Sequence, residues 1–332
     1  MRLPRGLVVA ALALAAAAAP AHSRASDSAA PEGWPARTVQ LVVPSPPGSG
    51  IDVVARLLAH RLTQAWSQPV VVQNRPGANS LIGTESVARA APDGYTLLFA
   101  SDSTFTVNPH LYAQLPYDPL RDFVPVAQVV TFHQLLVASP SLHARTVPEL
   151  VALARAEPGR ITYASFGAGS APHLLSELLR SQTRTDLLHV PYKGIGPAVA
   201  AVIAGESLLT WAGVYSTQAP VAAGRLVALG LAAPRRSALM PEVPTFAELG
   251  YPAIDYTLWF GLFAPTGTPR AVVERIHGDV AHTLADPDVR ERDLVAKGYA
   301  PSRLTPDQFA EHLRRELAER GVIVKLSGAR AE

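Results

Sequence analysis

A regular alternation of short apolar stretches with amphipathic ones constrains the fold of this chain more than any other feature. Strand patterns at 38–43, 70–72 and 95–100 alternate with helical patterns at 52–66 and 82–91. Apolar runs bounded by Gly and Pro indicate buried strands, and apolar positions three and four residues apart indicate one buried helix face. Because strand–helix–strand units build parallel sheets covered by helices, the alternation predicts an α/β fold.

The alternation resumes in the second half of the chain and ends in three successive helices. We expect strands at 160–165, 187–190, 208–211, 226–232 and 256–263 and helices at 147–156, 172–181, 197–204, 269–284, 288–297 and 306–326. A mature chain of about 300 residues is long enough for two domains. With crossings at 135–138 and 258–263, we expect two parallel-rich lobes flanked by helices: lobe 1 over 36–134 plus 258–332, and lobe 2 over 135–257.

The N-terminus predicts the compartment. Arg2 and Arg5 precede an apolar run over 6–19, and small residues suited to signal peptidase follow it. The run is shorter than the ~20 residues that a membrane-spanning helix needs, so a cleaved signal peptide is favoured over a membrane anchor. We expect a periplasmic protein with a signal peptide over 1–25, cut after Ala21 or Ala25, and a flexible leader over 26–35.

The composition argues against several classes of site. The chain contains no Cys, which excludes disulfides, thiolate metal sites and cysteine nucleophiles. The net charge is +2 and the basic residues do not gather into a stripe, so we expect no nucleic-acid partner. His277 and His282 are poorly spaced to share a metal on one helix face, and no HExxH pattern occurs. We therefore expect neither a metal nor a cofactor.

Two loops share one physical design. Residues 44–52 and 165–173 each leave a strand, pass through Gly and Ser residues, and open a helix. Gly allows backbone N–H groups to approach a ligand closely, and a helix N-terminus presents unpaired donors with a partial positive charge. Ser49 and Ser170 are suited to cap the helices, and Pro172 fits a first helical turn. In open α/β sheets such loops lie where ligands bind, so we expect an anion site.

Other interpretations of these loops remain open. Gly-rich turns between strands and helices are often only structural, although a pair of them favours function. Both loops lack the third Gly of a dinucleotide fingerprint and the Lys of a P-loop. Ser170 lacks the second Gly of a nucleophile elbow, so a hydrolase that pairs Ser170 with a remote base such as His189 is disfavoured. Ser101 and Tyr192 each follow a strand and are further candidates to face the ligand.

The sequence resembles the Bug-type (Bordetella uptake gene) extracytoplasmic solute receptors, the substrate-binding proteins of tripartite tricarboxylate transporters. The stretches that carry the resemblance are LVVP at 41–44, DVVAR at 52–56, NRPGA at 74–78, APDGYTL at 91–97, LPYDP at 115–119, HVPYKG at 189–194 and WFGLFAP at 259–265. The resemblance implies a type II periplasmic binding protein of the Venus-flytrap kind. It also implies that the two loops hold a ligand carboxylate through backbone N–H groups and bridging water.

Transferred to this sequence, the resemblance implies the following ligand-binding residues: Pro47, Gly48, Ser49 and Asp52 in the first loop and Ser165, Gly167, Ala168, Gly169, Ser170 and His173 in the second. Four positions depart from the family pattern and predict an altered, more apolar ligand: Ile51, Phe166, Leu208 and Ala212. We expect a monomer that is not an enzyme and that closes on a small organic carboxylate. Its protein partner is either permease subunits or, alternatively, the ectodomain of a signalling sensor.

Overall fold

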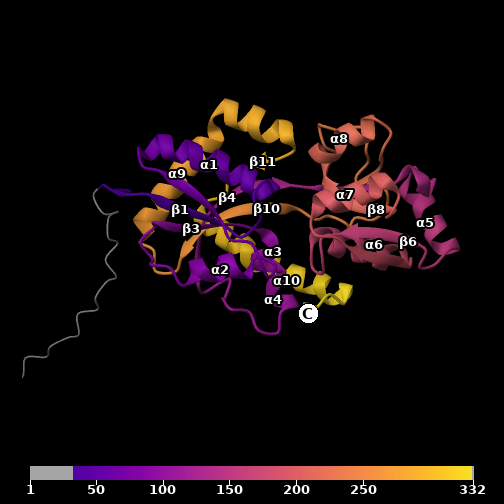
Figure 1. Cartoon of the computed structure of the whole chain (residues 1–332), viewed down its shortest axis with the longest axis horizontal. Helices are drawn as coiled ribbons and strands as arrows, with labels where there is room; N and C mark the ends of the chain where they lie inside the picture. The colour runs from indigo at the N-terminus through magenta and orange to yellow at the C-terminus, as the bar shows by residue number, and fades with distance from the viewer. Residues whose placement is uncertain (1–32, 331–332) are drawn as a thin grey trace, which may run out of the picture.

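The computed structural model describes residues 33–330, which form two α/β lobes lying side by side and joined by connecting strands (Figure 1). The expected signal peptide over 1–25 lies outside the described residues. Each lobe has its own sheet. The architecture confirms the predicted two-lobed α/β class, and both sheets prove to be mixed rather than purely parallel.

The first sheet has six strands in the order β11-β4-β10-β3-β1-β2. Its strands are β1 (Val39–Val43), β2 (Val70–Asn74), β3 (Thr96–Ser101), β4 (Phe123–Phe132), β10 (Leu258–Pro265) and β11 (Ala300–Pro301). Helices α1 (Gly50–Trp66) and α9 (Arg270–Ala285) pack on one face. Helices α2 (Leu81–Ala88), α3 (Asp102–Thr106) and α10 (Pro306–Ser327) pack on the other, so buried side chains fill both faces.

The second sheet has five strands in the order β7-β6-β8-β5-β9. Its strands are β5 (Gln134–Ala138), β6 (Ile161–Ser165), β7 (Leu187–Pro191), β8 (Leu209–Gly213) and β9 (Val227–Ala232). Helices α5 (Val147–Ala156) and α6 (Ala171–Thr183) cover one face. Helices α7 (Ile195–Ala204) and α8 (Val214–Ala222) cover the other. Between β5 and α5 the chain makes one 3-10 turn, Pro140–Leu142.

Strands β1, β2 and β3 run parallel, as do β6, β7 and β8, which is what the strand–helix alternation predicts. The strands next to the crossings run antiparallel: β10 pairs with β3 and β4, and β5 pairs with β8 and β9. Strand β4 was not predicted, because Pro125, Gln128 and Thr131 interrupt its apolar pattern. It ends one residue before β5 begins, so one crossing is almost continuous.

Helix α4 (Asn108–Leu111) and the end of α10 tie the first lobe to the second. Val107, Leu111 and Val324 are buried in the same cluster as Leu174 and Leu175 of α6. These two elements belong to the first lobe in sequence but pack on the second. Separating the two lobes at this contact would expose buried apolar surface.

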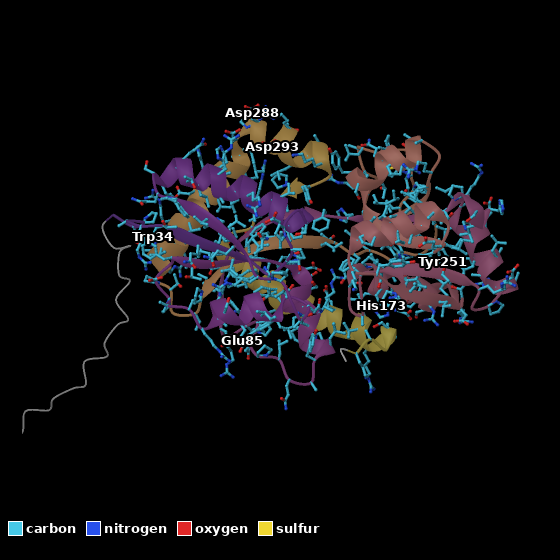
Figure 2. The ribbon with its side chains drawn as sticks, in the orientation of Figure 1. Trp34, Glu85, His173, Tyr251, Asp288 and Asp293 are labelled. Carbon is cyan, nitrogen blue, oxygen red and sulfur yellow. The ribbon has the colours of Figure 1, made fainter. Side chains whose placement is uncertain are left out.

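Two local expectations need correction. Trp34, which the sequence places in a flexible leader, is buried, and its ring centroid lies 5.1 Å from that of Trp66 at the outer end of the first lobe (Figure 2). The expected helix over 288–297 is a π-helical turn, Asp288–Leu294, followed by a 3-10 turn, Val295–Lys297. Gly298, in the left-handed region with φ +77°, ends that turn.

Candidate functional site

The first predicted loop connects β1 to α1 and is braced by a buried carboxylate. Asp52 is 2% exposed. It accepts hydrogen bonds from the Gly48 N–H at 2.8 Å, from Arg56 Nε at 2.9 Å and from Asn74 Nδ2 at 2.8 Å. Burial by itself raises the pKa of Asp52, but these hydrogen bonds outweigh burial and hold the pKa below its usual value. Asp52 is therefore ionised at neutral pH, and its oxygens already accept hydrogen bonds from the protein itself.

The second predicted loop, between β6 and α6, is braced in the same way by two side chains. Ser165 Oγ accepts a hydrogen bond from the Gly167 N–H at 3.0 Å, and His173 Nδ1 accepts one from the Gly169 N–H at 3.1 Å. His189 Nε2 lies 2.6 Å from Ser165 Oγ. Ser165 and His173 are both buried. The glycine N–H groups that we expected to face a ligand are thus used to shape the loop.

Two histidine rings stack beneath the second loop. The centroids of His173 and His189 lie 4.4 Å apart, and Tyr163 stacks on His189 at 4.9 Å. Burial, together with the neighbouring His189, lowers the pKa of His173 to about 4, and burial also lowers the pKa of His189. A neutral His173 can accept the Gly169 N–H, whereas an imidazolium has no free lone pair. The structure of the loop therefore requires His173 to be uncharged.

Neither Ser49 nor Ser170 accepts a side-chain hydrogen bond from the helix that it precedes. Ser49 is the N-cap residue of α1, but its Oγ donates to the Pro46 carbonyl at 2.8 Å. Ser170 is the N-cap residue of α6, but its Oγ donates to the Gly167 carbonyl at 2.6 Å. The expected side-chain caps are therefore absent from both helices. Because first-turn N–H groups have no partner within a helix, both N-termini keep open donors at their positive ends.

Contacts with neighbouring segments place both loops where the lobes meet. Ser80 Oγ donates to the Pro44 carbonyl at 3.0 Å, and the Asn79 side chain bonds to α4 at 2.8 Å. In turn, Leu111 of α4 touches the second loop: a Cβ on Gly169 would lie 2.1 Å from its Cδ1. Gly169 also has φ +74°, so close approach and backbone conformation both require glycine here. Figure 2 labels His173 on α6, where this helix passes the end of α10.

The structure gathers most of the predicted site residues into two clusters. The first holds Gly48, Ser49 and Asp52, and the second holds Ser165, Gly167, Gly169, Ser170, His173 and Tyr192, whose N–H donates to the Ser165 carbonyl. Pro47 and Ala168 are exposed on the loops, and Ser101 is half-buried at the end of β3. A cavity of about 1050 Å³ elsewhere between the lobes is lined by none of these residues.

The four departures from the family pattern differ in their surroundings. Ala212 is fully buried in β8, Ile51 is buried in the first core, and Leu208 packs against the second core. Phe166 is 42% exposed beside the second loop. Phe166 is therefore the one departure of the four whose bulk stands free beside a loop.

Sequence reasoning missed the residues that hold the loops from outside. Arg56 and Asn74 lie within motifs that carry the family resemblance. Arg56 follows Asp52 by four residues on α1, a spacing that could have indicated the ion pair, whereas the role of Asn74 depends on the pairing of β1 with β2. Likewise, His189 reaches Ser165 because β7 pairs with β6. For Leu111 the sequence offers no comparable signal, because α4 has only four residues.

Two lobes with mixed sheets of this order, joined by connecting strands, define a two-lobed periplasmic binding protein. Residues 54–328 match the tripartite tricarboxylate transporter family receptor, TctC. The chain belongs to this family. Protein BugT of Bordetella pertussis is 38% identical over 298 residues, which cover 90% of this chain and 91% of BugT.

Two similar structures contain carboxylates. Rpa4515 of R. palustris, solved with adipate, is 31% identical with a TM-score of 0.83, covering 90% of this chain and 99% of that one. MatC of Rhodopseudomonas palustris, solved with bound malate, is 31% identical with a TM-score of 0.79, covering 88% and 100%. Within residues 33–330 of our protein, no helix is long and apolar enough to cross a membrane, and no cluster of His, Asp or Glu could hold a metal ion.

Proposed function

We propose that this protein captures a small organic dicarboxylate between its lobes and presents it to the permease of a tripartite tricarboxylate-type transporter. The observation that carries the proposal is the pair of uncapped helix N-termini, one in each lobe, on loops that the protein itself braces. Each N-terminus attracts a carboxylate with roughly 0.3–1 kcal/mol, and up to about 2 kcal/mol where partly buried. Hydrogen bonds to a charged group add about 1.5–3 kcal/mol each.

The internal hydrogen bonds of the loops support binding rather than compete with it. Asp52 and His173 hold their loops in one conformation, so less conformational entropy is lost when a ligand arrives. The donors that we assign to the ligand are the first-turn N–H groups of α1 and α6, apart from Pro172, which has none, and the N–H of the exposed residue Ala168. This assignment refines the expectation that the loop glycines contact the ligand directly. Ser101 and Tyr192 are proposed as flanking walls.

The ligand class is inferred from the relatives. Adipate in Rpa4515 and malate in MatC are both dicarboxylates. Phe166 places an exposed aromatic ring beside the second loop, which favours a ligand with an apolar chain between its acid groups. We propose that lobe 1 (36–134 plus 258–332) and lobe 2 (135–257) close by rotation about the connecting strands. The closed form makes additional contacts to the ligand, and those contacts drive closure.

The proposal includes binding without turnover. The hydrolase alternative needs a base next to Ser170, but Ser170 Oγ donates to a carbonyl and His173 Nδ1 is occupied by the Gly169 N–H. His189 is next to Ser165 instead, and Ser165 is fully buried. We further propose export to the periplasm as a monomer after removal of 1–25. Co-purification with permease subunits rather than a sensor ectodomain would support the transport role over signalling.

A thermal-shift experiment with a matched pair of variants tests the proposal. Adipate and malate are added to the mature chain, to Ser170→Asp and to Thr146→Asp. Both substitutions place a carboxylate at a helix N-cap, a position that Asp favours, and both helices have a Pro in the first turn. Thr146 differs from Ser170 in that it caps α5, away from the loops.

A ligand at 100 times its Kd should stabilise the wild type by about 2.7 kcal/mol and raise its Tm. Thr146→Asp should respond like the wild type and Ser170→Asp should not, because its carboxylate repels the ligand. Equal responses from the two variants, or no response of the wild type to either acid, would count against the proposal.

A further inference from the structure

A cavity lined by none of the predicted ligand-binding residues has an unusual charge composition, and Tyr299 in its wall approaches Gly50 at the start of α1. It occupies about 1050 Å³ between the lobes and is lined by residues of β4, α9, the π-helical turn and β11 on one side and of the segment after β9 on the other. Four arginines and two histidines line it, and no Asp or Glu is among its lining residues. Four guanidinium groups with no carboxylate among the lining residues give the cavity a positive potential, which favours anions.

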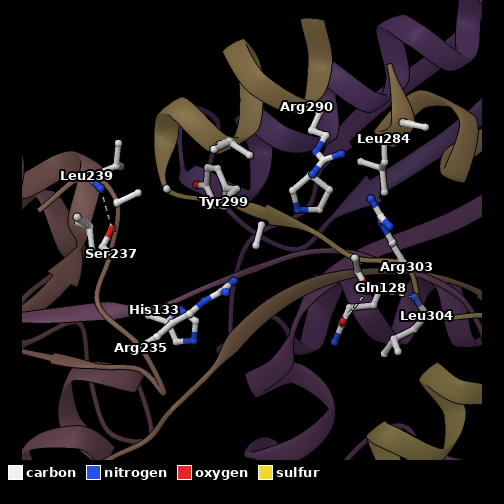
Figure 3. A pocket seen from close by; sticks show the side chains of 18 of the residues that line it. Gln128, His133, Arg235, Ser237, Leu239, Leu284, Arg290, Tyr299, Arg303 and Leu304 are labelled. Carbon is white, nitrogen blue, oxygen red and sulfur yellow. Dashed lines mark hydrogen bonds between the residues drawn. The ribbon is translucent and has the colours of Figure 1, made fainter. Parts of the chain in front are cut away.

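Two of these four arginines pair with a carboxylate, and the other two do not within the described part of the chain. Arg236 pairs with Glu248 at 3.0 Å, and Arg290 lies 3.3 Å from Glu291. Arg235 and Arg303 are exposed, and within residues 33–330 their guanidinium groups make no hydrogen bond or ion pair. Figure 3 shows Arg235 reaching over His133 toward the middle of the cavity from the second lobe, while Arg303 and Arg290 point toward one another from the first.

The remaining lining suits a small molecule with polar ends. Leu231, Leu239 and Leu284 contribute apolar surface, and Tyr299 lines the wall between them. A cavity of this size lies slightly above the usual range for small-molecule sites. Guanidinium groups recognise carboxylates through paired hydrogen bonds of matching geometry. The two unpaired arginines come from different lobes, so an anion with two acid groups can engage one arginine with each.

We propose that this cavity is a second binding site, for a small organic anion with at least two carboxylate groups, and that this anion bridges Arg235 and Arg303. The site lies beside β11 and β4 at one edge of the first sheet and beside β9 at one edge of the second sheet. The loops follow β1 and β6, which are nearer the opposite edges of the two sheets. This part of the inference rests on the proposed function: the lobe rotation proposed above would change the separation of Arg235 and Arg303. Occupancy of either site therefore alters the affinity of the other, and the effect is reciprocal.

Calorimetric titration of the mature chain with citrate at low ionic strength tests this site, with acetate as a single-carboxylate control. The test variant is Arg235→Gln with Arg303→Gln. The matched variant is Arg225→Gln with Arg314→Gln, which removes the same charge from exposed arginines that lie outside the cavity. All four positions are on the surface, so both proteins should fold, and thermal melting confirms it.

We expect wild type and matched variant to bind citrate more tightly than acetate, and the test variant to lose about tenfold or more of the citrate affinity. If citrate also occupies the loops, the titration shows two components and the test variant loses one of them. Citrate binding no tighter than acetate, or equal citrate affinity of the two double variants, overturns the second site. In either case the thermal shift of the wild type with adipate or malate alone still reports on the loops, so failure here is distinguishable from failure of the proposed function.

Discussion

Replacing His173 by Asn should make the protein less sensitive to mild acid. The amide oxygen of Asn can accept the Gly169 N–H in place of Nδ1, but it does not titrate. In the wild type, burial and the neighbouring His189 lower the pKa of His173 from 6.5 to about 4. The unfolded chain therefore binds more protons than the folded chain between these pH values, and stability is lost as the pH falls through this window.

The magnitude follows from those two pKa values. A group that titrates at 6.5 when unfolded and at about 4 when folded costs the wild type about 2 kcal/mol between pH 7 and pH 5. Urea unfolding of both proteins at pH 7 and pH 5 measures it, because contributions common to both cancel in the difference. His173→Asn should lose about 2 kcal/mol less than the wild type. Equal losses in the two proteins would refute the claim that the loop depends on a neutral His173.

Three further substitutions test the packing around the site. Asp52→Ala should cost about 2 kcal/mol in urea unfolding and abolish carboxylate binding in calorimetry, because it frees the first loop; unchanged affinity would contradict the bracing role. Gly169→Ala should cost about 2–3 kcal/mol, and Leu111→Ala in the same chain should recover the steric part; strictly additive losses would show that the contact does not matter. Glu316→Leu should cost about 3–5 kcal/mol, since it leaves the guanidinium of Arg320 buried without the carboxylate 2.6 Å away; a neutral effect in the same assay would contradict this.

The sequence predicts those strands and helices whose own residues show the apolar spacing typical of a strand or a helix. Strands β1 and β6 and helices α1 and α6 each carry a clear apolar pattern within their own residues. Their bounds lie within one or two residues of the expected ones. Strand β4 escaped prediction because Gln128, although buried, is polar and accepts a hydrogen bond from Ser302 of a distant segment. A hydrogen bond across 174 residues leaves no local trace in the sequence.

The site shows the same division. Gly, Ser and Pro at strand–helix junctions predict both loops, because the backbone geometry of a turn depends on the residues within it. How the donors are used could not be predicted. Asp52 takes the Gly48 N–H and His173 takes the Gly169 N–H, and both choices depend on side-chain rotamers and on the neighbours that lower the pKa of His173. The cap serines likewise turn to carbonyls rather than to their helices.

A crystal structure of the mature chain with adipate or malate tests the central claim most directly. That claim is that main-chain donors at the starts of α1 and α6 share one negatively charged guest. We predict carboxylate oxygens within hydrogen-bonding distance of N–H groups in the first turn of each helix, with the Asp52 and His173 bonds intact. A ligand held by side chains alone, or one that displaces Asp52 or His173 from the loop glycines, would contradict it.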